Sequence, residues 1–148
     1  MNLIKHVIPG IILCLFSLTQ ALASEDLVTV DGVEWKSTIT HQSSACKNIG
    51  QNIDKSHTYV IIAKTDKKVI VVHRKSGNTY HGKVDTENPM IIHYWASYLK
   101  DGGVVTERLQ FEKSDETSGK GKSEWNWSDG LMSCGGQYSF SAVRVEKQ

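Results

Sequence analysis

The chain has 148 residues, with 17 lysines and arginines against 16 aspartates and glutamates and a formal net charge of +1. This length is enough for one domain with a hydrophobic core. The balanced charge argues against a nucleic-acid-binding protein, which would show an excess of basic residues.

Residues 1–23 have the features of a signal peptide. Lys5 precedes an apolar run, and a small-residue cleavage pattern ends at Ala23. Cys14 follows a leucine rather than the small residue that precedes a lipidated cysteine. We therefore expect cleavage to release residues 24–148 as a single domain, secreted or periplasmic, with no membrane anchor. Cleavage removes one lysine and no acid, which leaves 16 basic and 16 acidic residues.

Alternating apolar and polar residues, interrupted by turn signals, predict eight β-strands in the rest of the chain. The longest segment without strand character is 42–56, where Cys46, Ile49 and Ile53 have the spacing of a short helix. The predicted strands cover residues 28–36, 57–64, 67–75, 79–84, 90–99, 104–112, 118–128 and 131–144.

Eight strands at short hairpin spacing predict an all-β fold, an antiparallel up-and-down barrel. An antiparallel β-sandwich is the alternative. Gly82, Gly119 and Gly121 favour the barrel, because closing a sheet requires strongly bent strands.

The Asp-Gly pair at 129–130 predicts a two-residue turn between the last two strands. In this register Trp125 lies opposite Cys134, and Trp127 shares the same face. The other face is almost wholly polar, so we expect both tryptophans to be buried. The residues expected to be exposed are Lys120, Lys122, Glu124 and Asn126.

Cys46 and Cys134 are the two cysteines left after signal cleavage. In an exported protein an even number of cysteines indicates a disulfide, although two buried free thiols are the alternative. The bond would close a loop of about 87 residues and stabilise the fold by roughly 4–5 kcal/mol. It would hold residues 42–56 as a lid at the end of the barrel that carries the 129–130 turn. A ligand would then enter at the opposite mouth or beneath the edge of that segment.

Gly32 and Trp35 form a Gly-x-x-Trp pattern on the first predicted strand, and Arg144 continues the inward positions of the last one. In these features the chain resembles calycins, the group of lipocalin and avidin barrels. Lipocalins carry Gly-x-Trp on the first strand, one residue shorter than here, and pack a late arginine over that tryptophan. The resemblance implies an eight-stranded barrel that holds a small molecule in its cup.

Glu107 occupies an apolar position, because it shares the inward phase of strand 104–112 with Val105 and Leu109. A buried carboxylate is costly without a partner. Arg144 is the partner we expect, because it also has an inward phase. Glu107 is therefore either a polar anchor for a ligand, or a structural ion pair or rim residue that reaches water.

Aromatic residues are the remaining candidates for a pocket that binds a flat or apolar ligand, unless they simply form the core. His93 lies between Ile91 and Trp95 in a strand that is apolar on both faces, so it is either a pocket residue or a hydrogen-bonded core histidine. Tyr94 and Tyr98 lie on the opposite face of the strand from Trp95, so either the two tyrosines or Trp95 must be more exposed to solvent. The candidate ligand-binding residues are Trp35, His93, Trp95, Glu107, Trp125, Trp127 and Arg144.

The sequence contains no close metal-ligand spacing, nucleophile motif or phosphate loop, so we predict no metal, cofactor or catalytic residue. We expect a non-catalytic protein that binds a small apolar or aromatic ligand in the barrel. The alternative is a protein-binding module, such as an inhibitor of an extracellular enzyme, acting through loops and exposed aromatic residues. An enzyme with its site in the cup is a third interpretation.

Overall fold

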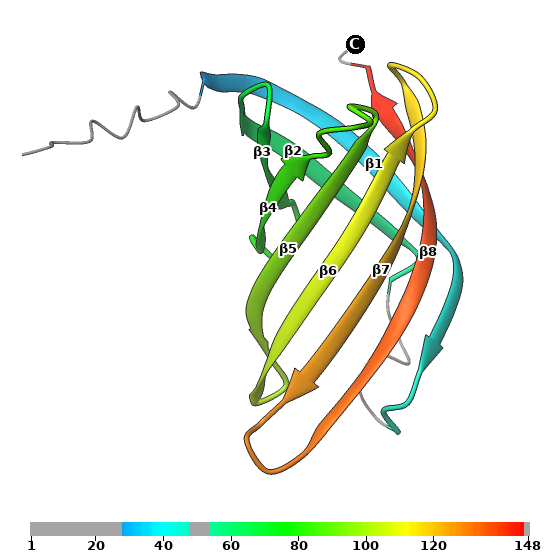
Figure 1. The fold of residues 1–148 in the computed structure, drawn as a ribbon. Coiled ribbons are helices and arrows are strands. Elements are labelled where there is room, and N and C mark those ends of the chain that lie inside the picture. Colours follow the sequence, from blue (N-terminus) through cyan, green and yellow to red (C-terminus); the bar gives the residue numbers. More distant parts are fainter. Residues whose placement is uncertain (1–27, 48–53, 147–148) are drawn as a thin grey trace, which may run out of the picture.

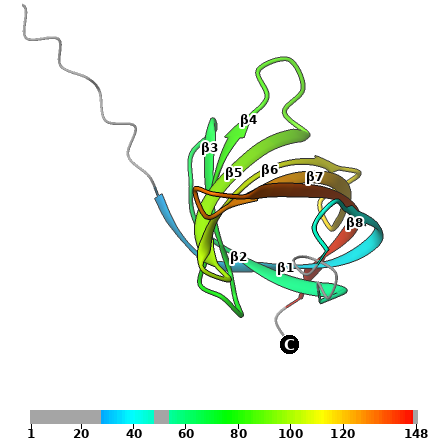
Figure 2. The same ribbon diagram turned by 90° about the horizontal axis from the view of Figure 1, so that it is seen from below.

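The computed structural model describes residues 28–47 and 54–146, so the expected signal peptide lies outside the described residues. Consecutive strands pair antiparallel, and β8 pairs with β1 to close the barrel (Figures 1 and 2). The predicted all-β, eight-stranded up-and-down barrel is therefore confirmed. The strands are β1 (Val28–Ser44), β2 (Ser56–Lys64), β3 (Lys68–His73), β4 (Thr79–Val84), β5 (Ile91–Lys100), β6 (Gly103–Lys113), β7 (Ser118–Ser128) and β8 (Ser133–Val145).

β1 is longer than predicted, because it continues beyond residue 36 to Ser44. Its first part pairs with β2, whereas its last residues pair with β8. Residues 37–44 contain Ile39 as their one apolar member, so they lack the alternation that marks a half-buried strand. The helix expected within 42–56 lies partly at 48–53, outside the described residues. No described residue belongs to a helix long and apolar enough to cross a membrane.

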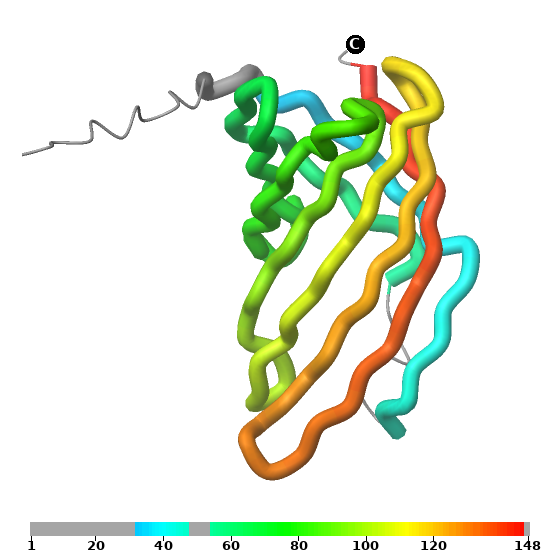
Figure 3. The backbone as a smooth tube through the Cα atoms, viewed as in Figure 1, coloured from blue at the N-terminus to red at the C-terminus, as the bar shows by residue number. Residues whose placement is uncertain are grey.

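The strands differ in length, and this shapes the barrel wall. β3 and β4 have six residues each, whereas β5 to β8 have between 10 and 13. We call the end with the β5–β6 and β7–β8 turns the lower end and the opposite one the upper end. The β3–β4 turn stops well short of the lower end (Figures 1 and 3). The part of the barrel wall formed by β3 and β4 is therefore shorter than the part formed by β5 to β8.

Side chains alternate between the interior and the solvent along each long strand. In β6, Val105, Glu107 and Leu109 are buried, whereas Thr106 and Arg108 are exposed. The same alternation buries Trp125 and Trp127 in β7, and their polar neighbours Lys120, Lys122, Glu124 and Asn126 are exposed. The predicted faces of the last hairpin are thus correct.

The register of that hairpin differs from the prediction by two residues. Trp125 lies opposite Gly136, and Cys134 lies opposite Trp127. A Cβ at Gly136 would lie 2.7 Å from Cζ2 of Trp125, so this position needs glycine to accommodate the indole. A shift of two residues preserves the inward and outward faces, since side chains alternate with a period of two.

The cause of the shift is a four-residue connection, residues 129–132, between Ser128 and Ser133. Oδ1 of Asp129 accepts hydrogen bonds from the backbone N–H groups of Leu131 (2.9 Å) and Met132 (2.7 Å). An aspartate side chain can replace backbone hydrogen bonds in a turn in this way. The predicted two-residue turn is therefore wrong, although its residues lie at the tip of the hairpin.

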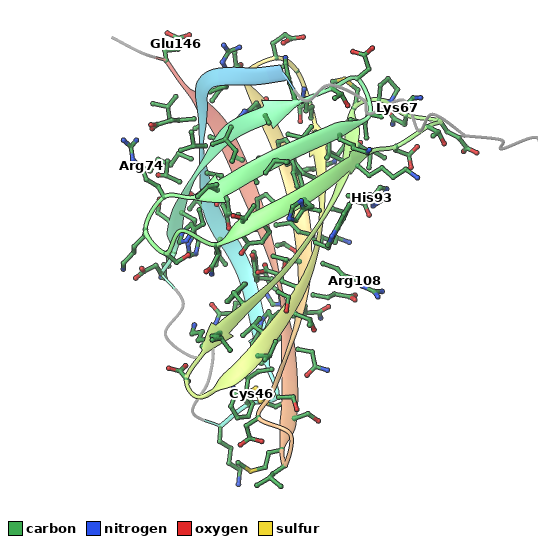
Figure 4. All side chains as sticks on the ribbon, turned by 90° about the vertical axis from the view of Figure 1, so that its left-hand side faces the viewer. Cys46, Lys67, Arg74, His93, Arg108 and Glu146 are labelled. Carbon is green, nitrogen blue, oxygen red and sulfur yellow. A yellow bond between two sulfur atoms is a disulfide. The ribbon has the colours of Figure 1, made fainter. Side chains whose placement is uncertain are left out.

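Cys46 and Cys134 form the predicted disulfide, with their Cα atoms 5.3 Å apart. Cys46 lies at the lower end, far from Lys67 and Glu146 (Figure 4). The bond links the segment after β1 to the start of β8. Such bonds persist in oxidising compartments, so this one is consistent with an extracellular or periplasmic location.

Candidate functional site

The described residues of the barrel interior form an upper and a lower cavity, and the side chains of Tyr59 and Tyr80 border both of them. The upper cavity has a volume of about 130 Å³. The lower cavity has a volume of about 420 Å³. The sequence predicted one pocket, whereas the described interior has an upper and a lower cavity with different chemistry.

The upper cavity is apolar. The edge of the Trp35 ring meets Phe111, with ring centroids 5.4 Å apart and an angle of 73° between the planes. Lys64 and Lys113, at the ends of β2 and β6, border the cavity at the upper end. The other apolar side chains lining it include Ile61, Val69, Val71, Ile92, Tyr94, Leu109, Phe140 and Ala142.

The lower cavity contains Glu107, which is 3% exposed and surrounded by hydroxyl groups. Tyr80 (2.8 Å) and Tyr98 (3.1 Å) donate hydrogen bonds to Oε2 of this carboxylate. Ser123 (2.6 Å) and Tyr138 donate to Oε1. An ionised carboxylate is an acceptor only, with about four lone-pair positions. Four hydroxyl donors therefore match the ionised form and satisfy the buried group.

The tyrosines around Glu107 are held in their neutral form. Burial, reinforced by the charge of Glu107, raises the pKa of Tyr80 and of Tyr138 far above the ordinary value of 10. The same two causes raise the pKa of Tyr59 and of Tyr98. These phenols therefore remain hydrogen-bond donors at any physiological pH.

Two histidines lie at the mouth of the lower cavity. Nδ1 of His57 is 3.2 Å from Nε2 of His73, and Nδ1 of His73 is 2.7 Å from Oγ of Ser76. The backbone N–H of Ser76 donates to Nδ1 of His73 (3.3 Å), so we assign the His73 proton to Nε2, from which it is donated to His57. Burial lowers the pKa of both histidines below 6.5. Burial therefore favours the neutral form of both histidines.

The structure places some of the predicted pocket residues inside the barrel. Trp35 lines the upper cavity, and Glu107 and Trp125 line the lower one. The indole N–H of Trp125 is buried without an acceptor among the described residues. Trp127 is buried but lines neither cavity, and its indole N–H donates to the backbone carbonyl of Lys100 (2.8 Å).

His93 and Trp95 lie on the outer surface, so their interpretation as interior residues is wrong. Nε2 of His93 is 3.3 Å from Oδ2 of Asp85, and Trp95 is 50% exposed and stacks on His81. β5 turns Tyr94 inward instead, where it lines the upper cavity. Because both faces of this strand carry aromatic and aliphatic residues, its sequence alone did not distinguish inside from outside.

The expected ion pair between Glu107 and Arg144 is absent from the described structure, where all four partners of Glu107 are hydroxyls. Arg144 lies directly opposite Trp35 in the pairing of β1 with β8, but it is exposed to solvent. Arg144 therefore follows the inward alternation predicted for it, but it lies at the rim of the barrel.

Sequence reasoning missed the hydroxyl cluster and the histidine pair. A signal for the cluster was present, because Tyr80, Tyr98, Ser123 and Tyr138 all occur at positions where a strand faces inward. A buried acid with several inward hydroxyls predicts a network of this kind. No group of three His, Cys, Asp or Glu residues in the described part of the chain is arranged to hold a metal ion.

Comparisons with protein-family models, curated proteins and solved structures found no match to this chain. The closed eight-stranded antiparallel barrel is compatible with a calycin-like architecture.

Proposed function

We propose that this chain is an exported, non-catalytic binding protein that holds a small apolar or aromatic ligand inside a calycin-like barrel. The observation that carries the proposal is the upper cavity, a space of about 130 Å³ lined by aromatic and aliphatic side chains. An apolar cavity of about 150 Å³ is large enough to bind benzene. The buried part of the ligand would thus be one ring or a short alkyl chain.

Two features support an exported protein that is secreted or periplasmic. The disulfide between Cys46 and Cys134 suits an oxidising compartment. The first 23 residues have a charged start, an apolar run and a small-residue cleavage pattern. The ligand would therefore be one that the protein meets outside the cytoplasm.

Native mass spectrometry of the purified protein would identify a ligand that co-purifies with it. Titration with benzene and indole, followed by the shift in melting temperature, tests the cavity directly, because a ligand that binds only the folded state raises this temperature. Ala142→Phe fills the upper cavity and should abolish the shift. Ser141→Phe adds the same ring to the outer face of β8 and should preserve it. Equal shifts in the two variants would contradict binding in the upper cavity.

A protein-binding module, such as an inhibitor of an extracellular enzyme, is the second candidate. Large apolar side chains are exposed at the lower end, where Leu99 is 83%, Leu131 95% and Met132 66% exposed. Exposed apolar groups of this kind often mark a binding surface. Inhibition assays against extracellular hydrolases would test it, with Leu131→Ser expected to abolish inhibition and Ala142→Phe expected to preserve it.

A further inference from the structure

The inner part of the lower cavity carries one negative charge without a cationic partner. Besides the two histidines, the acidic and basic residues that line the cavity are Asp54, Lys100 and Glu107. Oδ2 of Asp54 lies 2.5 Å from Nζ of Lys75, so this exposed acid has a basic partner at the rim. Among the described residues, no lysine, arginine or histidine forms an ion pair with Glu107. In the described structure its carboxylate accepts hydrogen bonds from the hydroxyls of Tyr80, Tyr98, Ser123 and Tyr138.

Aromatic rings form the walls around this carboxylate. Tyr59 and Tyr80 meet edge to face, with centroids 5.5 Å apart and an angle of 85° between their planes. Tyr80 and Tyr98 are 6.5 Å apart at an angle of 53°. Trp125 and Tyr138 complete the aromatic lining on the side of β7 and β8. Ring faces are electron-rich and attract cations.

We propose that the lower cavity binds a small organic cation, a protonated or quaternary amine carrying an aromatic or short alkyl group. Its charge would lie between Glu107 and the tyrosine rings. The inference rests on the proposed binding function and specifies the charge of the ligand and its position. The volume of about 420 Å³ lies within the range of small-molecule sites.

The same groups would discriminate against other ligands. An anion would be repelled by the buried carboxylate of Glu107, while Lys100, which is exposed at the rim, would offset little of this repulsion. A neutral molecule of the same shape would gain the apolar contacts but would lack the electrostatic attraction to Glu107. Specificity would therefore come from the rejection of acids as well as from the attraction of amines.

Three ligands of similar shape test the charge preference by isothermal titration calorimetry on the disulfide-bonded protein: 2-phenylethylamine, 2-phenylethanol and 3-phenylpropionate. We expect the amine to bind roughly 10-fold more tightly than the alcohol, which corresponds to the range of cation–π interactions. The acid should bind most weakly. Equal affinities of the amine and the alcohol for the wild-type protein would overturn the proposal.

Variants locate the site. Glu107→Gln should reduce the affinity for the amine to that for the alcohol, whereas Glu124→Gln, which makes the same change on the outer face of β7, should have no effect. Tyr98→Leu removes one ring of the cage at a half-buried position and should weaken amine binding several-fold. Tyr98→Leu therefore still tests the site if Glu107→Gln does not fold. A preference for the amine that survives both changes would place the site elsewhere.

Benzene binding in the upper cavity distinguishes failure of this inference from failure of the proposed function. If benzene binds and Ala142→Phe prevents it, while the amine shows no preference, the binding function stands and the cation site is rejected. If neither benzene nor the amine binds to the folded protein, both are rejected. A preference for the amine that is lost in Glu107→Gln and retained in Ala142→Phe would establish the lower cavity as a distinct site.

Discussion

The hydroxyl of Tyr80 donates a 2.8 Å hydrogen bond to Oε2 of Glu107, and so links β4 to β6 inside the barrel with β5 lying between them. The remaining donors extend this link, because Tyr98 belongs to β5, Ser123 to β7 and Tyr138 to β8. Five consecutive strands thus each contribute one side chain to the same cluster. Glu107 therefore joins the short strand β4 to the four long strands β5 to β8 from within the barrel.

Replacing Glu107 with leucine should lower the free energy of unfolding by about 3 kcal/mol or more, because four hydroxyls inside the barrel would lose their acceptor. Glu107→Gln should cost less, about 1–2 kcal/mol, because the amide oxygen still accepts hydrogen bonds. Urea unfolding followed by tryptophan fluorescence measures both. Glu124→Gln, on the outer face, is the control and should change stability by less than about 0.5 kcal/mol. A leucine variant as stable as the wild type would contradict a structural role for the cluster.

The inward position of Glu107 was predictable from β6 alone, but its partners were not. Strand alternation is local, so it correctly assigned Glu107 and both tryptophans of β7 to the interior. Which side chains reach Glu107 depends on the register of each strand relative to its neighbours. This register is set by the closure of the barrel. Arg144 has the right phase but lies at the upper rim, whereas Tyr98 lies lower in the barrel, within reach of Glu107.

The hairpin and β5 show two further limits of sequence reasoning. The last hairpin is closed by the Asp129 side chain and by a backbone hydrogen bond from the Asp129 N–H to the carbonyl of Met132 (3.3 Å), rather than by a turn of residues 129–130 alone. An Asp-Gly pair in the sequence does not distinguish these cases. In β5, His93 and Trp95 alternate with Ile92 and Tyr94, so neither face is clearly polar. Only the pairing of β5 with β4 and β6 decides that Tyr94 points inward.

Stability should fall as the pH drops below about 6.5, because His57 and His73 have lowered pKa values in the folded state. The unfolded chain binds protons near pH 6.5, while the folded chain binds them only at lower pH, so acid favours unfolding in this interval. Burial is the main cause of both shifts. The charges of Asp54 and Glu107 act in the opposite direction, and that of Lys75 reinforces the lowering.

Melting temperatures measured between pH 7.5 and 5 would show this decline, and the double variant His57→Gln/His73→Gln should flatten it. His41→Gln is the control, since this histidine is exposed on β1 and its change should leave the decline in place. A decline that persists unchanged in the double variant would assign the acid sensitivity to other groups.

Replacing both Cys46 and Cys134 with serine should lower the free energy of unfolding by a few kcal/mol, up to about 4–5 kcal/mol in the chain-entropy model. The loss of local protection should be largest at the end of β1. Residues 41–44 pair with β8, whereas the pairing of β1 with β2 ends at Thr38, and the N–H of Ala45 bonds to the carbonyl of Gly135 (2.9 Å). Hydrogen exchange measures this effect, and the amides of β5 and β6 serve as the internal reference. Uniform loss of protection across the barrel would show that the bond does not act locally, and an unchanged melting temperature would show that the bond does not form in solution.

Deleting Leu131 and Met132 should give a protein with the same fold and an equal or higher melting temperature. Ser128 would still pair with Ser133, and the remaining residues 129–130 would form the two-residue Asp-Gly turn that antiparallel strands favour. Little packing would be lost, because the two deleted side chains are 95% and 66% exposed.

Deletion of Leu131 alone is the informative comparison. It leaves a three-residue connection, which either adopts a bulged turn or shifts the register by one residue. A one-residue shift would turn Trp125 and Trp127 outward, and their fluorescence would move to the red. The double deletion should retain the emission maximum of the wild type, since the tryptophans stay buried. A large loss of stability in the double deletion would instead show that the hydrogen bonds within the connection 129–132 hold the hairpin in register. The deletion removes the N–H groups of Leu131 and Met132, which donate to Oδ1 of Asp129, and the carbonyl of Met132, which accepts from the N–H of Asp129.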